Sequence, residues 1–126
     1  MKTLRYLLEE ISAQQLKDLE KFGDRLLNKF NVDIEFTRHF GDRMNDDRNK
    51  PKISVPEVQR LFKKIQKQKA TKIKQNANDQ AVLKDMQADL NLPVVIDYKN
   101  GEFEVTMKTI MRKKNFTTPN TTIEYK

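Results

Sequence analysis

A histidine and two arginines in the middle of the chain offer the clearest chemistry in this sequence. The chain contains a single histidine, His39, and Arg43 follows four residues later, so a helix would place both side chains on one face. Arg48 follows in the next predicted loop. An imidazole can exchange protons near neutral pH, and guanidinium groups can clamp a phosphate through two hydrogen bonds. These groups suit metal-free RNA cleavage, with His39 and Arg43 as the candidate catalytic residues and Arg48 as a candidate phosphate ligand.

The same spacing also has a purely structural interpretation. Three carboxylates, Asp42, Asp46 and Asp47, lie close in sequence to the two arginines and could pair with them. His39 would then be an ordinary surface residue. A His-x-x-x-Arg pattern is short and common, so the spacing alone favours this interpretation over catalysis.

A second basic segment follows the expected C-terminal strands. Lys108 and Arg112 are spaced to project from the same side of one strand, Lys113 comes directly after, and Phe116 is near enough to stack on a base. Basic side chains on an exposed strand can follow a phosphate backbone, so these three are predicted nucleic-acid ligands. The alternative is that the lysines protect a sheet edge from aggregation.

The excess positive charge is concentrated in one part of the chain. The net charge is +7, and residues 41–76 hold eleven Lys or Arg and four Asp or Glu, whereas residues 1–40 and 77–126 each hold seven of either sign. A localised positive field attracts polyanions and gains affinity by releasing their counterions. The predicted partner is a nucleic acid, RNA rather than DNA, and the alternative is a solvated lysine-rich helix. The predicted ligands here are Arg60, Lys63, Lys64 and Lys67.

Helices are expected to position most of these groups. Apolar residues recur at helical spacing in five segments, and a Ser-x-x-Gln and a Ser-x-x-Glu capping box mark two of the starts, at Ser12 and Ser54. The predicted helices cover residues 3–11, 12–30, 37–46, 54–74 and 78–89. The alternating segment 32–36 is a strand or an extended connector.

Towards the C-terminus the apolar pattern changes to the period of a strand. Residues 94–99 and 102–108 flank Asn100-Gly101, the strongest short signal for a hairpin. A two-residue turn pairs six apolar residues on one face, Tyr98 with Phe103, Ile96 with Val105, and Val94 with Met107. Residues 121–125 could add a third strand. The predicted fold class is α+β, with N-terminal helices packed on a small antiparallel sheet.

Several functional classes are not expected. The absence of cysteine excludes disulfides and thiolate metal sites, and the apolar runs are too short to span a membrane. Asp97 and Glu104 should face each other across the hairpin, but two carboxylates without further ligands make a weak metal site, and neutralisation by a neighbouring lysine is favoured. We predict no metal, no cofactor and no membrane partner. The N-terminus lacks the features of a signal peptide, which predicts a cytoplasmic protein.

Two blocks of the sequence resemble a small bacteriophage protein family of unknown function. The first runs from His39 to Arg48 and continues over residues 53–62. The second covers residues 83–93 and 108–119, and it includes Lys108-Thr-Ile-Met-Arg-Lys-Lys-Asn-Phe. The resemblance covers roughly residues 36–119. The chain length fits one α+β domain over residues 1–126, with a helical N-terminal arm at residues 1–30 and the family-like part at residues 36–119. If a phage encodes the protein, the expected location is the host cytoplasm.

The order of a His-x-x-x-Arg helix, a capped helix and antiparallel strands ending in a basic segment is more distantly similar to the barnase–EndoU–colicin–RelE group of metal-independent ribonucleases. This resemblance implies that RNA lies across the sheet and that the protein is a RelE-like endoribonuclease. It implies His39 as the acid–base residue and Arg43, Arg48, Lys108 and Arg112 as the phosphate ligands. The alternatives are a non-catalytic nucleic-acid-binding accessory protein, and a protein that binds an acidic host protein through the 60–74 helix.

Overall fold

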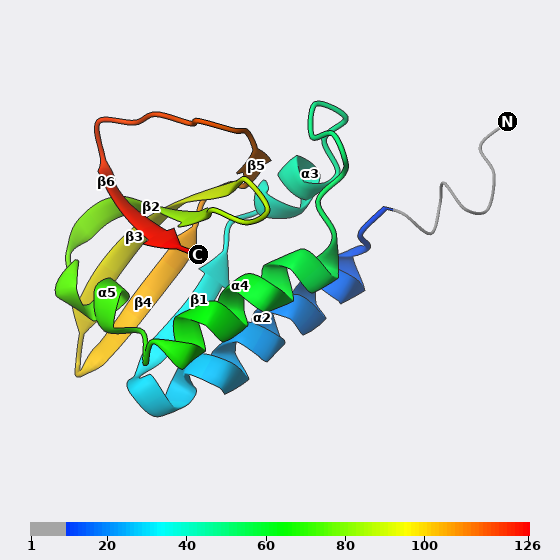
Figure 1. Cartoon of the computed structure of the whole chain (residues 1–126). Coiled ribbons are helices and arrows are strands. Elements are labelled where there is room, and N and C mark those ends of the chain that lie inside the picture. The colour runs from blue at the N-terminus through cyan, green and yellow to red at the C-terminus, as the bar shows by residue number, and fades with distance from the viewer. Residues whose placement is uncertain (1–9) are drawn as a thin grey trace, which may run out of the picture.

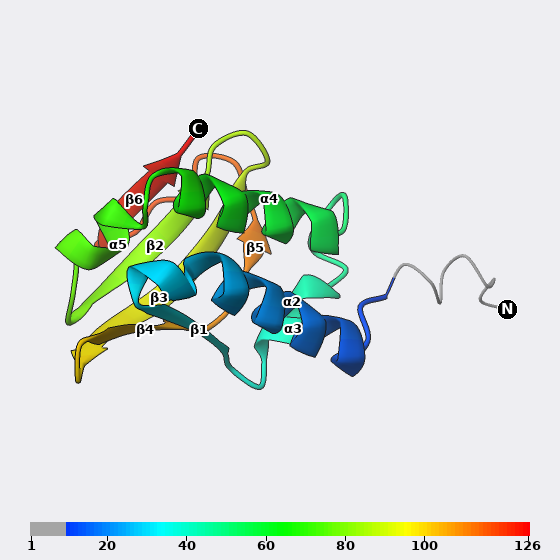
Figure 2. The same ribbon diagram turned by 90° about the horizontal axis from the view of Figure 1, so that it is seen from below.

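Two helices lie side by side on one face of a six-stranded sheet in the computed structural model, which describes residues 10–126 (Figure 1). The helices are α2 (Ala13–Leu27) and α4 (Val55–Lys67), and both views show them side by side (Figures 1 and 2). They pack against each other. Of the helix predicted over residues 3–11, residues 3–9 lie outside the described part of the chain, and residues 10 and 11 are not helical. The chain is thus α+β, with an N-terminal helix packed on the sheet.

Both predicted capping boxes are confirmed. The Ser12 hydroxyl accepts a hydrogen bond from the Gln15 amide at 3.1 Å, and the Ser12 amide donates to Gln15 Oε1 at 2.9 Å. At α4 the Ser54 amide donates to Glu57 Oε1 at 3.0 Å. These bonds satisfy amides that the first turn of a helix leaves without partners, so each helix begins where its cap requires.

Close packing of α2 on α4 depends on a glycine. A Cβ atom added at Gly23 would lie 2.9 Å from Cε2 of Phe62, closer than side-chain atoms normally approach. The apolar faces of both helices then reach the sheet, and Leu19 and Leu27 of α2 join Leu61 and Phe62 of α4 in one buried cluster. The N-terminal segment predicted as an arm therefore supplies part of the core.

The sheet is mixed rather than purely antiparallel. The strand order is β1 (Val32–Phe36), β4 (Glu102–Met107), β3 (Leu90–Lys99), β2 (Asp79–Asp85) and β6 (Thr121–Tyr125), and the short β5 (Met111–Arg112) also pairs with β3. The hairpin of β3 and β4 has the predicted register. However, β1 runs parallel to β4 and β6 runs parallel to β2. Each parallel pair is joined by a long connection, as parallel strands require.

The helix predicted over residues 78–89 is wrong. Residues Asp79–Asp85 form β2 instead, paired with both β3 and β6, and Met86 lies in the following turn with 44% of its surface exposed. Ala81, Val82 and Leu83 are buried in succession because both faces of this strand are covered. Their continuous apolar run suits a buried helix as well as a buried strand, and the tertiary pairing decides between them.

Three short helical segments complete the fold: the 3₁₀ turn η1 (Asn28–Phe30), α3 (Phe40–Met44) and α5 (Thr71–Gln75). The helix α3 lies within the predicted 37–46 segment, and Phe40 and Met44 are fully buried as expected. The Phe40 ring stacks on Phe36, with centroids 4.2 Å apart. This stacking fixes α3 against the end of β1, which matters for the site below.

The face of the sheet opposite the helices has two different regions. Over β2 and β3 it is covered by residues 113–120, and Lys84 Nζ donates to the Phe116 carbonyl at 2.8 Å. Over β1, β4 and β3 the cross-strand register instead places Asp33, Glu104 and Asp97 in one row. Glu35, one pleat further along β1, is exposed beside this row. The uncovered region is therefore acidic.

Candidate functional site

Parallel pairing of β1 with β4 brings two distant basic segments together. Phe36 pairs with Met107, so both strands end at the same edge of the sheet. The Thr37 amide donates to the Met107 carbonyl at 3.1 Å, and the Thr37 hydroxyl donates to the Lys108 carbonyl at 2.7 Å. The residues that follow each strand must then meet.

They meet around a pocket of about 730 Å³. One wall comes from the segment after β1 and the other from the segment after β4. The lining residues are His39, Arg43, Asp46, Arg48, Asn49, Lys108, Thr109, Ile110, Met111, Arg112 and Lys113. Six of the ten side chains that we predicted for catalysis or for nucleic-acid binding therefore border one pocket.

His39 and Arg43 share one helical turn, as predicted. His39 directly precedes α3, and the Arg43 amide donates to the His39 carbonyl at 3.0 Å. Both residues are exposed. An accessible imidazole and an accessible guanidinium thus lie at the mouth of the same pocket.

Asp46 is the carboxylate in this lining, and both Arg43 and Arg48 approach it. Arg48 contacts it through Nε and Nη2, the latter at 2.8 Å, and Arg43 Nη1 lies 3.6 Å away. Hydrogen bonds from Arg48, and then the charge of Arg43, hold the pKa of Asp46 well below its usual range. The Arg48 side chain still has 78% of its surface exposed. Asp46 thus remains an anion that orients two cations at the rim.

Lys108 and Lys113 supply the opposite wall. Lys108 follows the last residue of β4 and is exposed, and its amide donates to the Pro93 carbonyl at 3.0 Å. Lys113 is also exposed, and its amide donates to the Asp89 carbonyl at 2.9 Å. Both backbones are fixed while both ammonium groups remain accessible.

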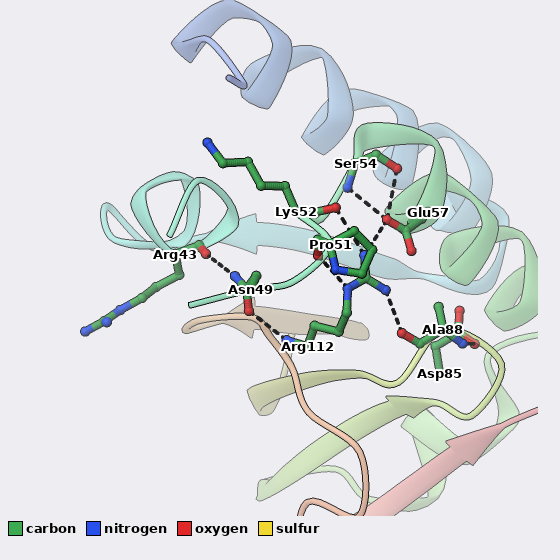
Figure 3. A network of polar contacts seen from close by, with 9 residues as sticks. All are labelled: Arg43, Asn49, Pro51, Lys52, Ser54, Glu57, Asp85, Ala88 and Arg112. Carbon is green, nitrogen blue, oxygen red and sulfur yellow. Dashed lines mark hydrogen bonds and ion pairs between the residues drawn. The ribbon is translucent and has the colours of Figure 1, made fainter. Parts of the chain in front are cut away.

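Arg112 has a different role from the one predicted. It does not continue a strand from Lys108, because β4 ends at Met107 and the next two residues that pair with the sheet form β5. Its guanidinium turns into the protein, where it donates to Glu57 Oε1 at 2.7 Å and to the carbonyls of Pro51, Lys52 and Ala88 (Figure 3). Arg112 therefore cannot serve as a phosphate ligand without breaking this network.

The Arg112–Glu57 pair holds the pocket against α4. Both side chains are largely buried, with 12% and 16% of their surfaces exposed. Burial alone would raise the pKa of Glu57, but hydrogen bonds from Arg112 and Ser54 outweigh it, and the net shift is below the usual value. Glu57 thus stays ionised, caps α4 and pairs with Arg112 at the same time.

Two buried asparagines that the sequence analysis did not single out complete the frame. Asn49 accepts a hydrogen bond from the Arg112 amide at 2.9 Å and donates to the Arg43 carbonyl at 2.8 Å, which links both walls of the pocket (Figure 3). Asn91 donates to the carbonyls of Met111 and Lys113. In sequence, Asn49 belongs to a polar loop of ordinary composition, so no local signal marked it.

The predicted ligands on α4 do not line this pocket. Arg60, Lys63 and Lys67 are exposed along the helix, whereas Lys64 is largely buried and donates to Asp85 Oδ1 at 2.9 Å. Lys64 therefore stabilises the packing of α4 on β2. The other three form a separate basic surface.

The acidic region of the sheet argues against one expectation from the ribonuclease resemblance. RNA lying across β1, β4 and β3 would meet Asp33, Glu104, Asp97 and Glu35. Partial burial, together with the charges of Asp33, Glu20 and Glu104, raises the pKa of Glu35. A polyanion would be repelled from this face.

Among residues 10–126, no group of three or more His, Asp or Glu side chains is arranged to hold a metal ion. No helix within the same residues is long and apolar enough to cross a membrane. Comparison of the chain with protein-family models, with curated proteins and with solved structures finds no match. The geometry of the pocket is therefore the basis for any functional assignment.

Proposed function

We propose that the protein binds RNA with a phosphodiester in the pocket between α3 and residues 108–113, and that it cleaves the RNA there without a metal. The observation that carries this proposal is the convergence of His39 with Arg43, Arg48, Lys108 and Lys113 around one pocket. Arg112 also lines the pocket, but its charge is paired with Glu57. The other four cations share the lining with one carboxylate, that of Asp46. Such an excess of positive charge suits a phosphate and the additional charge of its transition state.

The chemistry follows from these groups. His39 accepts the proton of a ribose 2′-OH, and the 2′ oxygen attacks the phosphorus. The bond from phosphorus to the 5′ oxygen breaks, and the 5′ oxygen takes a proton from water. The His39 imidazolium returns its proton to the hydroxide that this leaves, and the RNA fragment retains a 2′,3′-cyclic phosphate. Arg43 and Lys108, from opposite walls, stabilise the charge on the non-bridging oxygens.

A second candidate function is RNA binding without cleavage. It is favoured by the state of Asp46, which both arginines engage and which is therefore poorly suited to act as a second proton carrier beside His39. In this case the pocket holds the phosphate through the same cations, and the RNA leaves intact.

Incubation of RNA with the protein in EDTA separates the two candidates. Cleavage predicts products that end in a 2′,3′-cyclic phosphate, and His39→Ala should lower the rate by about 10²- to 10⁴-fold because it removes the proton carrier. Arg38→Ala is the matched control, since Arg38 is an exposed neighbour that does not line the pocket.

Intact RNA at micromolar protein, or equal cleavage by the wild type and His39→Ala, would exclude the catalytic proposal. Loss of RNA binding in Arg43→Ala and Lys108→Ala, with no product from the wild type, would leave the binding function. Wild-type affinity in both of these variants would remove the pocket from either function.

A further inference from the structure

The outer surface of the two-helix layer carries basic side chains on both helices. On α2 the residues that contact the core recur at helical spacing, and three exposed cations lie four residues apart on the opposite side. On α4 three exposed cations have the equivalent position. We define the cationic helix face by these six residues: Lys17, Lys21, Arg25, Arg60, Lys63 and Lys67.

The two rows are neighbours because the helices pack side by side (Figures 1 and 2). Lys63 of α4 lies over the ring of Phe22 in α2, with Nζ 6.0 Å from the ring centroid. The α2 row extends for ~12 Å along its helix, and helix axes in such contact are ~8–10 Å apart. The six cations therefore lie on one outer surface of the helix layer, which also includes Asp18.

Two of the three acidic residues of α2 are bonded to β1. Glu20 Oε2 accepts a hydrogen bond from the Phe36 amide at 2.7 Å, and Asp24 Oδ1 accepts one from the Ile34 amide at 2.6 Å. Both carboxylates therefore face β1. Asp18 is on the outer side, where it accepts a hydrogen bond from Gln14. Residues 1–40 have equal numbers of basic and acidic residues, but in α2 the exposed cations and two of the carboxylates lie on different sides of the helix.

The cations of this face are available to a ligand. No carboxylate among residues 10–126 lies within 4.0 Å of any of the six charged groups. The face also lacks an aromatic platform, because Phe22 is half-buried beneath Lys63 and the exposed large apolar residues of the described chain are Met86 and Tyr98. Single-stranded nucleic acids are usually held by stacking on aromatic rings, whereas duplexes are held through phosphates.

We infer that the cationic helix face binds the phosphate backbone of a base-paired RNA region, separately from the pocket. This inference rests on the proposed function in one respect, namely that RNA is the ligand of both surfaces. Two parallel rows of cations can contact several successive phosphates, since each strand of a duplex carries one charge per ~3.4 Å of axis. The face would thus hold a structured RNA while a single-stranded phosphodiester enters the pocket.

The test uses an RNA duplex of about 16 base pairs, which is comparable to the span of known double-stranded RNA-binding modules. Both strands carry 2′-O-methyl groups, so that the pocket cannot cleave them, and binding is followed by fluorescence polarisation over a series of salt concentrations. The first variant is Lys17→Gln, Lys21→Gln, Arg25→Gln and the second is Arg60→Gln, Lys63→Gln, Lys67→Gln. The charge-matched control is Lys99→Gln, Lys114→Gln, Lys126→Gln, at exposed positions outside the face and the pocket.

Each helix variant should bind the duplex at least ~10-fold more weakly, and the slope of log affinity against log salt should fall in magnitude by about 2–3, because three phosphate contacts are lost. The control variant should bind the duplex like the wild type. Glutamine keeps helix propensity close to that of lysine, and circular dichroism checks that the helices are intact.

Wild-type affinity in the α2 variant, or equal weakening in the control, would overturn the inference. The inference would also be overturned if this face bound a single-stranded RNA of the same length, or polyglutamate, more tightly than it binds the duplex. Either result would assign the face to another ligand. Failure of the proposed pocket function would be seen in different measurements, namely the RNA cleavage assay and the RNA affinity of Arg43→Ala and Lys108→Ala.

Discussion

At the residue scale, the structure divides the basic side chains by what their charge contacts. Arg43, Lys108 and Lys113 present their charge to solvent at the pocket, whereas Arg112 uses its guanidinium to join three parts of the chain. Their types and spacing in the sequence predict the same role, contact with a nucleic acid, for all of these residues. Their difference arises because Arg112 lies beside a buried carboxylate and three backbone carbonyls, which only the folded chain brings together.

Arg112→Ala should destabilise the protein by roughly 3–5 kcal/mol, because it leaves the Glu57 carboxylate buried without its partner. Arg112→Lys should recover little of this loss, since one ammonium cannot reproduce the planar set of donors. The measurement is urea unfolding at neutral pH. A loss of less than ~1 kcal/mol in the alanine variant would show that the network contributes little to stability.

At the element scale, both edges of the sheet are closed by charged side chains from helices. On β1, Glu20 and Asp24 accept hydrogen bonds from the outward amides of Phe36 and Ile34. On β6, Lys72 Nζ donates to the Glu124 carbonyl at 3.0 Å. An exposed strand edge invites pairing with another chain, and these contacts block it.

Asp24 gives this arrangement a dependence on pH. Burial raises its pKa to about 7, against the opposing effect of the Ile34 hydrogen bond and with further help from the charges of Asp33 and Glu20. The folded state binds the proton of Asp24 more tightly than the unfolded chain does. Protonated Asp24 therefore makes its full contribution to the free energy of unfolding below about pH 4, and this contribution is lost as the pH rises through 7.

Asp24→Asn should therefore remove this dependence, since the amide oxygen still accepts the Ile34 hydrogen bond and does not titrate. Relative to the wild type, the variant should gain free energy of unfolding as the pH rises from about 5 to 8. Asp18→Asn, at an exposed carboxylate of the same helix, is the control. Parallel stability curves for wild type and Asp24→Asn would contradict the assignment.

Prediction from sequence was correct where the signal is local. The two capping boxes and the Asn100-Gly101 hairpin depend on residues a few positions apart, and all three are observed. The parallel pairing of β1 with β4 joins segments about seventy residues apart and has no local signature. It is also what brings His39 to Lys108. Residue types therefore marked the two basic segments as candidates, but no local signal predicted that they border the same pocket.

At the scale of the whole molecule, positive and negative charge lie on different sides. The pocket and the cationic helix face are basic, whereas the uncovered region of the sheet carries Asp33, Glu35, Glu104 and Asp97. The net charge of residues 1–40 is zero in the sequence. That sum combines positive and negative side chains that the fold separates. We therefore expect RNA to approach the pocket end and the helices, and to avoid the acidic sheet.

The most direct test is an NMR titration of the ¹⁵N-labelled protein with a short single-stranded oligonucleotide that lacks the reactive 2′-OH. The account predicts saturable shifts of the His39 ring and of the amides of Arg43, Lys108 and Lys113, reduced by added salt, with the amides of β1 unchanged. Shifts centred on Asp33, Glu104 and Asp97, or no shifts at the pocket at low ionic strength, would contradict it.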